Sequence, residues 1–156
     1  VIGGVLVILA VAVGFTGYLI DAQVPTQMAE WVKASVASPA LFLLALNVFL
    51  IIVGCLMDIF SAIVVVVPLI VPIAQHFGIN PVHLGVIFIA NLELGYLTPP
   101  VGLNLFLSSY RFNKPVMQIA RATLPMLGVL AVGVLLITYV PWLTTGLLDL
   151  LGRAQP

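Results

Sequence analysis

The chain consists of apolar runs separated by short polar segments, and the length of each run predicts how it meets a membrane. The runs cover residues 3–20, 39–57, 62–74, 83–94, 101–110 and 124–142. An α-helix rises ~1.5 Å per residue, so about 20 apolar residues are needed to cross ~30 Å of hydrocarbon. We therefore expect the first and the last run to be complete transmembrane helices.

Residues 1–37 combine the first predicted span with a segment of mixed polarity. The first run has no basic residue before it and no small-residue cleavage site after it, which favours a transmembrane helix over a signal peptide. The segment AQVPTQMAEWVKASVA (22–37) is typical of a short interfacial helix anchored by Trp31; a polar loop is the alternative. Because the sequence begins inside an apolar helix and without Met, we expect the C-terminal part of a longer polypeptide.

The second and third runs flank a polar break, GCLMD at residues 54–58. The third run is punctuated by Pro68 and Pro72 and would rise only ~20 Å, which is too short for an untilted crossing. Non-helical backbone is tolerated at membrane depth only where protein or a water-filled cavity surrounds it. The pattern favours a re-entrant hairpin over residues 38–77, with two complete spans as the alternative.

The runs 83–94 and 101–110 lie on either side of the sequence GYLTPP. Each would rise only ~15–18 Å, so neither spans the membrane alone. Joined through the break, they predict one interrupted crossing over residues 82–110. Two broken elements in succession, each with glycine and an acidic residue at the break, are typical of a transporter whose site lies near the bilayer midplane.

The second break contains residues that free backbone oxygens. Pro99 and Pro100 have no amide hydrogen, so carbonyls of the preceding turn lose their helical partners. Small and polar residues surround this pair: Gly95, Thr98, Gly102 and Asn104. Their oxygens suit a hard cation such as Na⁺, whereas amides at the start of the next helix suit an anionic group. A proline kink that serves only packing is the alternative.

Two acidic residues lie within apolar sequence, where an aspartate costs ~2.5–3.5 kcal/mol in lipid. Asp58 is therefore expected to face a partner or a cavity, as a cation ligand or a balancing charge. It also suits the N-cap of the following helix. Glu93, with Asn91 two residues before it, either supports the break or takes part in ion or proton coupling.

The remaining polar residues of the apolar runs carry simpler expectations. Asn47 is typical of a hydrogen bond between membrane helices. His76 and His83 lie near the turn predicted at residues 75–81, where we expect a loop or interfacial position and no metal site.

Composition agrees with an all-α polytopic membrane protein and excludes several functions. Hydrophobic residues make up 63% of the 156 residues, charged residues 6%, and five acids balance five bases, so no footprint for nucleic acid appears. The single cysteine, Cys55, allows no internal disulfide. Neither a metal-ligand spacing nor a nucleophile–base pairing is present, and we expect neither an enzyme nor a cofactor.

Residues 111–156 contain a basic connector followed by the last predicted span and a tail. The segment RFNKPVMQIAR (111–121) has a net charge of +3. Basic connectors favour the cytoplasmic side of the membrane. The hairpin would then enter from the opposite side.

Several motifs occur together and in order between residues 54 and 110. They are G-x-x-x-D at the first break, P-x-x-x-P, GINPVHLG at the turn, and GYLTPPVGLNLF at the second break. The set resembles the C-terminal half of the DctM-like large membrane subunit of tripartite ATP-independent periplasmic (TRAP) transporters. The flanking runs agree with that family only in general character.

The resemblance implies an ion-transporter-type fold with two inverted repeats, the second formed by this hairpin and broken helix. It implies Na⁺-driven uptake of an organic acid, such as a C4-dicarboxylate or sialic acid, by an elevator mechanism in the bacterial inner membrane. The implied partners are a small four-helix membrane subunit and a periplasmic substrate-binding protein. The resemblance places around one Na⁺ site the residues Gly54, Asp58, Ser61, Thr98, Pro99 and Gly102.

The sequence departs from the family in one respect, because these residues contain no first repeat with its own hairpin and ion site. We therefore expect this chain not to transport alone. The alternatives are a tricarboxylate- or citrate-type carrier, a proton-coupled carrier and a non-transporting membrane scaffold.

Overall fold

The structure is a computed structural model that describes residues 10, 14, 17–18, 21–23, 27, 30, 38–57, 59–99 and 102–150. Its helices are α3 (Pro39–Leu56), α4 (Ile59–His76), α5 (Pro81–Tyr96), α6 (Leu103–Phe112), α7 (Val116–Tyr139) and α8 (Trp142–Leu150). The all-α prediction is confirmed for this part of the chain. The predicted first span and the predicted interfacial helix of residues 22–37 lie almost wholly outside the described residues.

Local sequence sets the starts of α3 and α5. The hydroxyl of Ser38 accepts a hydrogen bond from the amide of Leu41 at 3.3 Å, with a proline in the first turn. In the same way, Asn80 Oδ1 accepts from the amide of Val82 at 2.8 Å, again next to a proline. A capping side chain followed by proline satisfies or removes amides that have no partner inside the helix.

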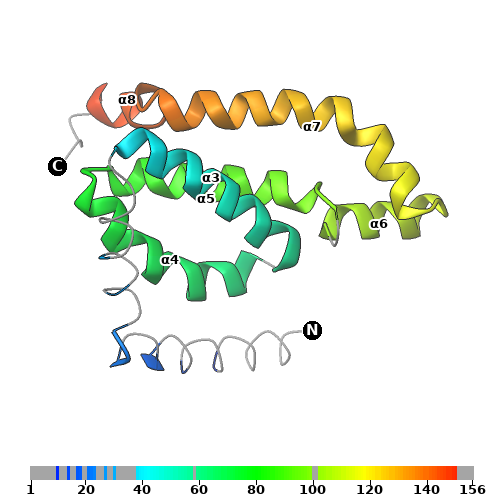
Figure 1. Ribbon diagram of the computed structural model, residues 1–156. Coiled ribbons are helices and arrows are strands. Elements are labelled where there is room, and N and C mark those ends of the chain that lie inside the picture. Colours follow the sequence, from blue (N-terminus) through cyan, green and yellow to red (C-terminus); the bar gives the residue numbers. More distant parts are fainter. Residues whose placement is uncertain are drawn as a thin grey trace.

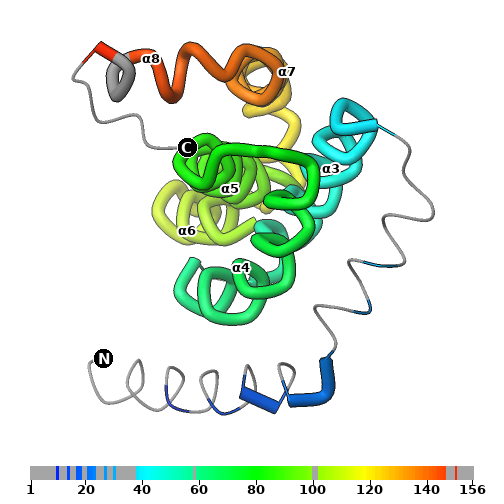
Figure 2. Tube along the Cα trace, turned by 90° about the vertical axis from the view of Figure 1, so that its left-hand side faces the viewer, coloured from blue at the N-terminus to red at the C-terminus, as the bar shows by residue number. Residues whose placement is uncertain are grey.

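The helix α5 is central in the described part of the chain. It packs against α3, α4, α7 and α8, and Figure 2 shows it between α3, α4 and α7. α3 and α5 run in the same direction, α6 continues beyond the end of α5, and α7 runs back over them (Figure 1). The core between α3, α4 and α5 includes Phe42, Leu46, Leu50, Val53, Ala62, Val66, Ile70, Ile73, Leu84, Ile87, Phe88 and Leu92.

The helix α4 is longer than the apolar run from which it was predicted. It has 18 residues, Ile59–His76, because it extends the run 62–74 by three residues at its start and two at its end, with Pro68 and Pro72 inside it. Both α3 and α4 are long and apolar enough to cross a membrane, so the expectation that the third run is too short was wrong. The re-entrant hairpin over residues 38–77 stays a prediction.

The broken helix and the last span are found close to their predicted positions. α5 and α6 are separate helices interrupted between Leu97 and Gly102, which confirms the interruption. That the two halves form one crossing stays a prediction. α7 begins at Val116, directly after Pro115, whereas the predicted start was residue 124. The helix therefore includes part of the basic segment.

The outer surface of the described part is strongly apolar. Besides α3 and α4, α7 is long and apolar enough to span a membrane, and only 11% of its apolar window is buried inside the structure. Side chains such as Leu124, Val129 and Val132 are more than half exposed. Soluble proteins rarely expose apolar surface of this extent. The arrangement is that of a polytopic membrane protein.

Candidate functional site

The ends of α3 and α5 meet at two buried glycines. A Cβ on Gly95 would lie 2.7 Å from the C and Cα atoms of Gly54 and 2.8 Å from the carbonyl oxygen of Ile51. A Cβ on Gly54 would lie 2.9 Å from the Cα and carbonyl oxygen of Leu92. A larger residue at either position would separate the helices, so the glycines permit direct contact between the two backbones.

The start of α6 reaches the same place through Gly102. Its amide donates a hydrogen bond to the carbonyl oxygen of Cys55 at the end of α3, with an N···O distance of 3.2 Å. Its φ of +40° lies in the left-handed region that favours glycine. A Cβ here would lie 2.8 Å from the carbonyl oxygen of Thr98 and 3.0 Å from that of Tyr96. Carbonyl oxygens from the end of α5 therefore lie close around Gly102.

Thr98 closes the last turn of α5. Its hydroxyl donates to the carbonyl oxygen of Leu94 at 2.9 Å, and its amide donates to that of Gly95 at 2.9 Å. A hydroxyl that donates in this way still offers oxygen lone pairs to a ligand. Pro99 follows it and is exposed, while Pro100 lies outside the described residues.

Three helix ends come together at this point, and a fourth follows closely in the chain. α3 and α5 end here, α4 begins at Ile59 directly after the end of α3, and α6 begins at Leu103. Helix C-termini carry unpaired carbonyls and partial negative charge, whereas helix N-termini carry unpaired amides and partial positive charge. Backbone groups alone therefore suit this place to a cation and to an anionic group.

Glu93 and Asn104 face one another across the break. The side-chain amide of Asn104 donates to Glu93 Oε1 at 3.4 Å, which links the end of α5 to the first turn of α6. Glu93 is exposed and Asn104 is half-buried. The carboxylate therefore lies on the outer face of the broken helix in the described part.

The structure brings Gly54, Gly95, Thr98 and Gly102 together, but it describes the predicted hairpin residues only in part. Ser61 is half-buried in the first turn of α4. Asp58 lies outside the described residues.

Asn91 belongs to a separate buried cluster, one helical turn before Gly95. Its Nδ2 donates to Asn47 Oδ1 of α3 at 2.6 Å and to the carbonyl oxygen of Ile87 at 2.8 Å. Asn47 Oδ1 also accepts from the hydroxyl of Thr138 in α7 at 3.1 Å. The interhelical hydrogen bond expected for Asn47 is confirmed.

His83 is buried between helices, and the expected loop or interfacial position was wrong. The side chain is 3% exposed, with Nδ1 2.7 Å from the hydroxyl of Thr144 and Nε2 3.2 Å from the carbonyl oxygen of Thr138. A carbonyl only accepts, so Nε2 carries the hydrogen. The missed signal is the spacing from His83 to Asn91, two steps of four residues, which places both on one face of a helix. His76, in contrast, is exposed at the end of α4.

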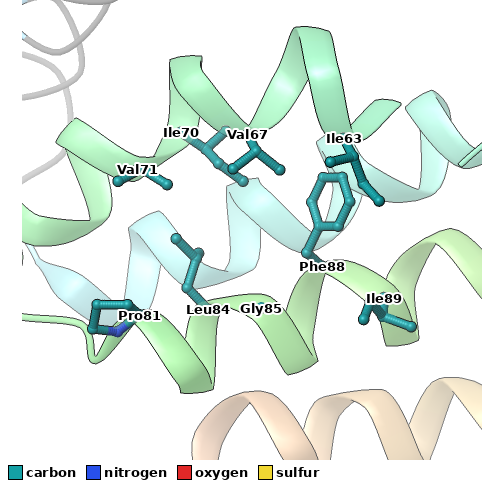
Figure 3. Close-up of a pocket in the computed structure, with 9 residues that line it drawn as sticks. All are labelled: Ile63, Val67, Ile70, Val71, Pro81, Leu84, Gly85, Phe88 and Ile89. Atoms are coloured by element: carbon teal, nitrogen blue, oxygen red, sulfur yellow. The ribbon is translucent and has the colours of Figure 1, made fainter. Parts of the chain in front are cut away.

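An apolar cavity of about 220 Å³ lies between α4 and α5. Figure 3 shows its lining, which consists of Ile63, Val67, Ile70, Val71, Pro81, Leu84, Gly85, Phe88 and Ile89. The lining side chains offer neither charge nor hydrogen bond, and polar groups are what orient an ion or a carboxylate in a pocket. The candidate site is therefore the meeting point of the helix ends and not this cavity.

Transition-metal chemistry finds no support in the described residues. Among them, no group of three His, Cys, Asp or Glu side chains is placed to hold a metal ion. Cys55 is a free, buried thiol whose Sγ lies 3.2 Å from the carbonyl oxygen of Ile52.

Similarity to known proteins extends over most of the chain. Residues 1–143 match the family described as tripartite ATP-independent periplasmic transporter, DctM component. The C4-dicarboxylate TRAP transporter large permease protein DctM of Pseudomonas aeruginosa is 40% identical over 147 residues, which are 94% of this chain and 34% of that protein. The protein of the same description from Vibrio cholerae is 38% identical over 133 residues, 85% of this chain and 29% of that protein.

A further relative carries a different substrate name. The isethionate TRAP transporter permease protein DctMQ of Oleidesulfovibrio alaskensis is 36% identical over 137 residues, which are 88% of this chain and 22% of that protein. The chain therefore spans about a third or less of the length of these relatives.

Proposed function

Because the chain belongs to the DctM family of tripartite ATP-independent periplasmic (TRAP) transporters, we propose that it forms a cation-binding part of a large permease subunit. The subunit takes up an organic acid across the bacterial inner membrane, driven by a Na⁺ gradient. The observation that carries the proposal is the meeting of the ends of α3 and α5 with the start of α6 at Gly54, Gly95 and Gly102.

The proposed Na⁺ lies between the end of α3 and the interruption after α5. Its ligands are drawn from Gly54, Asp58, Ser61, Thr98, Pro99 and Gly102. Carbonyls at two helix C-termini carry partial negative charge toward the cation. Thr98 adds a hydroxyl oxygen, and the Asp58 carboxylate balances the positive charge. Gly95 supports the site because only glycine lets the two helix ends approach this closely.

The proposed substrate is an organic anion that binds next to the cation. The starts of α4 and α6 supply amides with partial positive charge, which suit a carboxylate or a similar group. The relatives' names give a C4-dicarboxylate and isethionate, and both are anions. Glu93 and Asn104 lie beside this position, where they support the site or approach the substrate.

The proposed transport cycle moves Na⁺ and substrate together in an elevator mechanism. The helices α3 and α4 act as the hairpin of the second inverted repeat, and α5 and α6 act as its broken helix. A periplasmic binding protein delivers the substrate, and a small four-helix membrane subunit completes the assembly. The remaining length of the relatives leaves room for the first repeat.

A proton-coupled carrier is the second candidate, because Glu93 places a carboxylate at the break. Its Oε1 accepts a hydrogen bond from Asn104, and the side chain is exposed in the described part. A carboxylate that gains and loses a proton in each cycle would make uptake follow a pH gradient without Na⁺. Glu93→Gln would then abolish coupled uptake, whereas Na⁺ coupling predicts that Na⁺ dependence survives this change.

The proposal is tested with the full-length subunit, reconstituted with its membrane partner and binding protein. Uptake of a labelled C4-dicarboxylate is followed with and without a Na⁺ gradient for wild type, Asp58→Asn and Thr98→Ala. Thr123→Ala is the matched control, because the Thr123 hydroxyl also donates to a carbonyl of its own helix, that of Ala120 at 3.0 Å, but in α7.

Na⁺-driven uptake in wild type and in the Thr123 variant, with a raised Na⁺ requirement in the other two, is the expected result. Unchanged Na⁺ dependence in both Asp58→Asn and Thr98→Ala would leave the break with a structural role only. That result would favour a membrane scaffold function for this segment, or a cation site elsewhere in the subunit.

A further inference from the structure

A series of buried polar contacts joins four helices beside the break. His83 of α5 contacts the hydroxyl of Thr144 in α8 and the carbonyl of Thr138 in α7. The hydroxyl of Thr138 donates to Asn47 of α3, which also accepts from Asn91 of α5. Asn47, His83, Asn91 and Thr138 are each at most 4% exposed. Few polar side chains of the described part are buried to this degree, and these four form one network.

The network lies on one stripe of α5 that ends at the break. His83, Ile87, Asn91 and Gly95 follow one another at steps of four residues, so they share one face of the helix. The stripe is tied to α7 and α8 at its start and to α3 in its middle. At its end, the backbone of Gly95 rests on α3. The hydrogen-bonded amide pair of Asn47 and Asn91 therefore sets how α5 lies against α3. It lies one turn before the glycine contact between Gly54 and Gly95.

The amide pair contributes little to stability in this arrangement. Asn47 Nδ2 and Asn91 Oδ1 are buried and have no hydrogen-bond partner within the described part of the chain. One unpartnered polar atom in the interior costs more than a single interhelical hydrogen bond in a membrane contributes. Two leucines of similar shape would avoid this cost. Leucines would not, however, supply a directional bond that selects one register, which is a known use of buried asparagine.

We propose that Asn47 and Asn91 are positioning residues for the cation site, because their hydrogen bond fixes the register between α3 and α5. A slip of α5 against α3 would separate the glycine contact and move the two helix C-termini out of reach of one cation. The contacts of Thr138 and His83 hold α7 and α8 in the same rigid unit. This role rests on the Na⁺ site proposed above.

The test compares Asn47→Leu/Asn91→Leu with wild type in the full-length subunit, reconstituted with its partners. One readout is the Na⁺ concentration that gives half-maximal uptake. The other is the rate at which Cys55 reacts with a maleimide, in a subunit from which any cysteine outside this chain has been removed. Cys55 is 7% exposed at the helix contact, so a lost register increases its labelling. Leu50→Met/Leu84→Met is the matched control, since it changes buried apolar residues of the same two helices with little change in volume.

The double leucine variant should unfold at a temperature no lower than that of wild type. It should nevertheless need about 10- to 100-fold more Na⁺, the range typical when outer contacts of a metal site are removed. Its Cys55 should react faster than in wild type, and the methionine control should match wild type in both readouts. An unchanged Na⁺ requirement in the folded double variant overturns the proposal.

Two further outcomes also decide the proposal: a double variant that does not fold, and wild-type uptake that does not depend on Na⁺. If the double variant does not fold, Asn91→Leu alone removes the same hydrogen bond while Asn47 Oδ1 still accepts from the Thr138 hydroxyl, with Leu84→Met as its control. An unchanged Na⁺ requirement in folded Asn91→Leu then overturns the positioning role. If uptake by wild type ignores Na⁺, the Na⁺ site itself is wrong, and unchanged Cys55 labelling in the variant would also remove the register role.

Discussion

The contact between α3 and α5 makes a quantitative prediction for Gly95→Ala. The added Cβ would lie 2.7 Å from the backbone of Gly54, whereas ordinary contact begins at 3.4 Å, so the helices must separate by about 0.7 Å. The atoms that the new Cβ would meet all belong to the backbone of α3, so no side chain can rotate to relieve the contact. Overpacking of this kind costs about 1–3 kcal/mol.

Gly85→Ala, in the same helix, isolates this cost. A Cβ on Gly85 meets no atom within 4 Å. Both alanines lie in α5, where alanine gains up to about 1 kcal/mol over glycine, so most of this gain cancels in the comparison. We therefore expect Gly95→Ala to be about 1–3 kcal/mol less stable than Gly85→Ala.

The assay is equilibrium or thermal unfolding of the purified full-length variants in the same detergent, followed by Na⁺-dependent uptake after reconstitution. Gly95→Ala should also raise the Na⁺ requirement, because the displaced α3 carries the Cys55 carbonyl that accepts from Gly102. Equal stability of the two alanine variants would refute the close contact. Lower stability with an unchanged Na⁺ requirement would leave the contact real but separate it from the cation site.

Three further predictions follow from single positions. Gly102→Ala should be about 1–3 kcal/mol less stable than Gly78→Ala in thermal unfolding, because both glycines have a positive φ but only the Cβ at position 102 would meet backbone, the carbonyl oxygen of Thr98 at 2.8 Å; equal stability would argue against this close contact. His83→Phe should cost about 1–3 kcal/mol through polar groups left without partners, whereas His76→Phe, at an exposed position, should change the unfolding temperature little. Lys114→Cys should react with an impermeant maleimide only in inside-out vesicles, since the basic connector favours the cytoplasm; labelling from the outside would reverse the topology.

The positions of the helices could be predicted where local chemistry decides them. The capping residues Ser38 and Asn80 start helices where the sequence changes from polar to apolar, and the proline pair after Thr98 interrupts one. The length of α4 was missed because the polar residues Ser61 and Gln75 were taken as the limits of the apolar run, although the helix continues through both, with Pro68 and Pro72 inside it. Proline is tolerated inside membrane helices, where neighbouring groups satisfy the freed carbonyl.

The candidate site could be predicted in its local part and not in its long-range part. Thr98 and Gly102 lie within one short segment, so their proximity follows from the chain itself. The partners of His83 lie 55 and 61 residues further along the chain, and no local pattern specifies them. The contact between Gly54 and Gly95 is likewise a property of packing, although glycine at both breaks indicated where to look.

The central claim is a Na⁺ site formed by the ends of α3 and α5, and equilibrium binding tests it most directly. The unfolding temperature of the purified full-length subunit is measured as NaCl replaces KCl at constant ionic strength, for wild type, Thr98→Ala and Thr123→Ala. A ligand that binds only the folded state stabilises it by about 2.7 kcal/mol at 100 times its Kd. Wild type and Thr123→Ala should be stabilised by Na⁺ and not by K⁺, and Thr98→Ala should need more Na⁺ for the same effect. Identical Na⁺ titrations for Thr98→Ala and wild type, or no preference for Na⁺ over K⁺ in wild type, would contradict the claim.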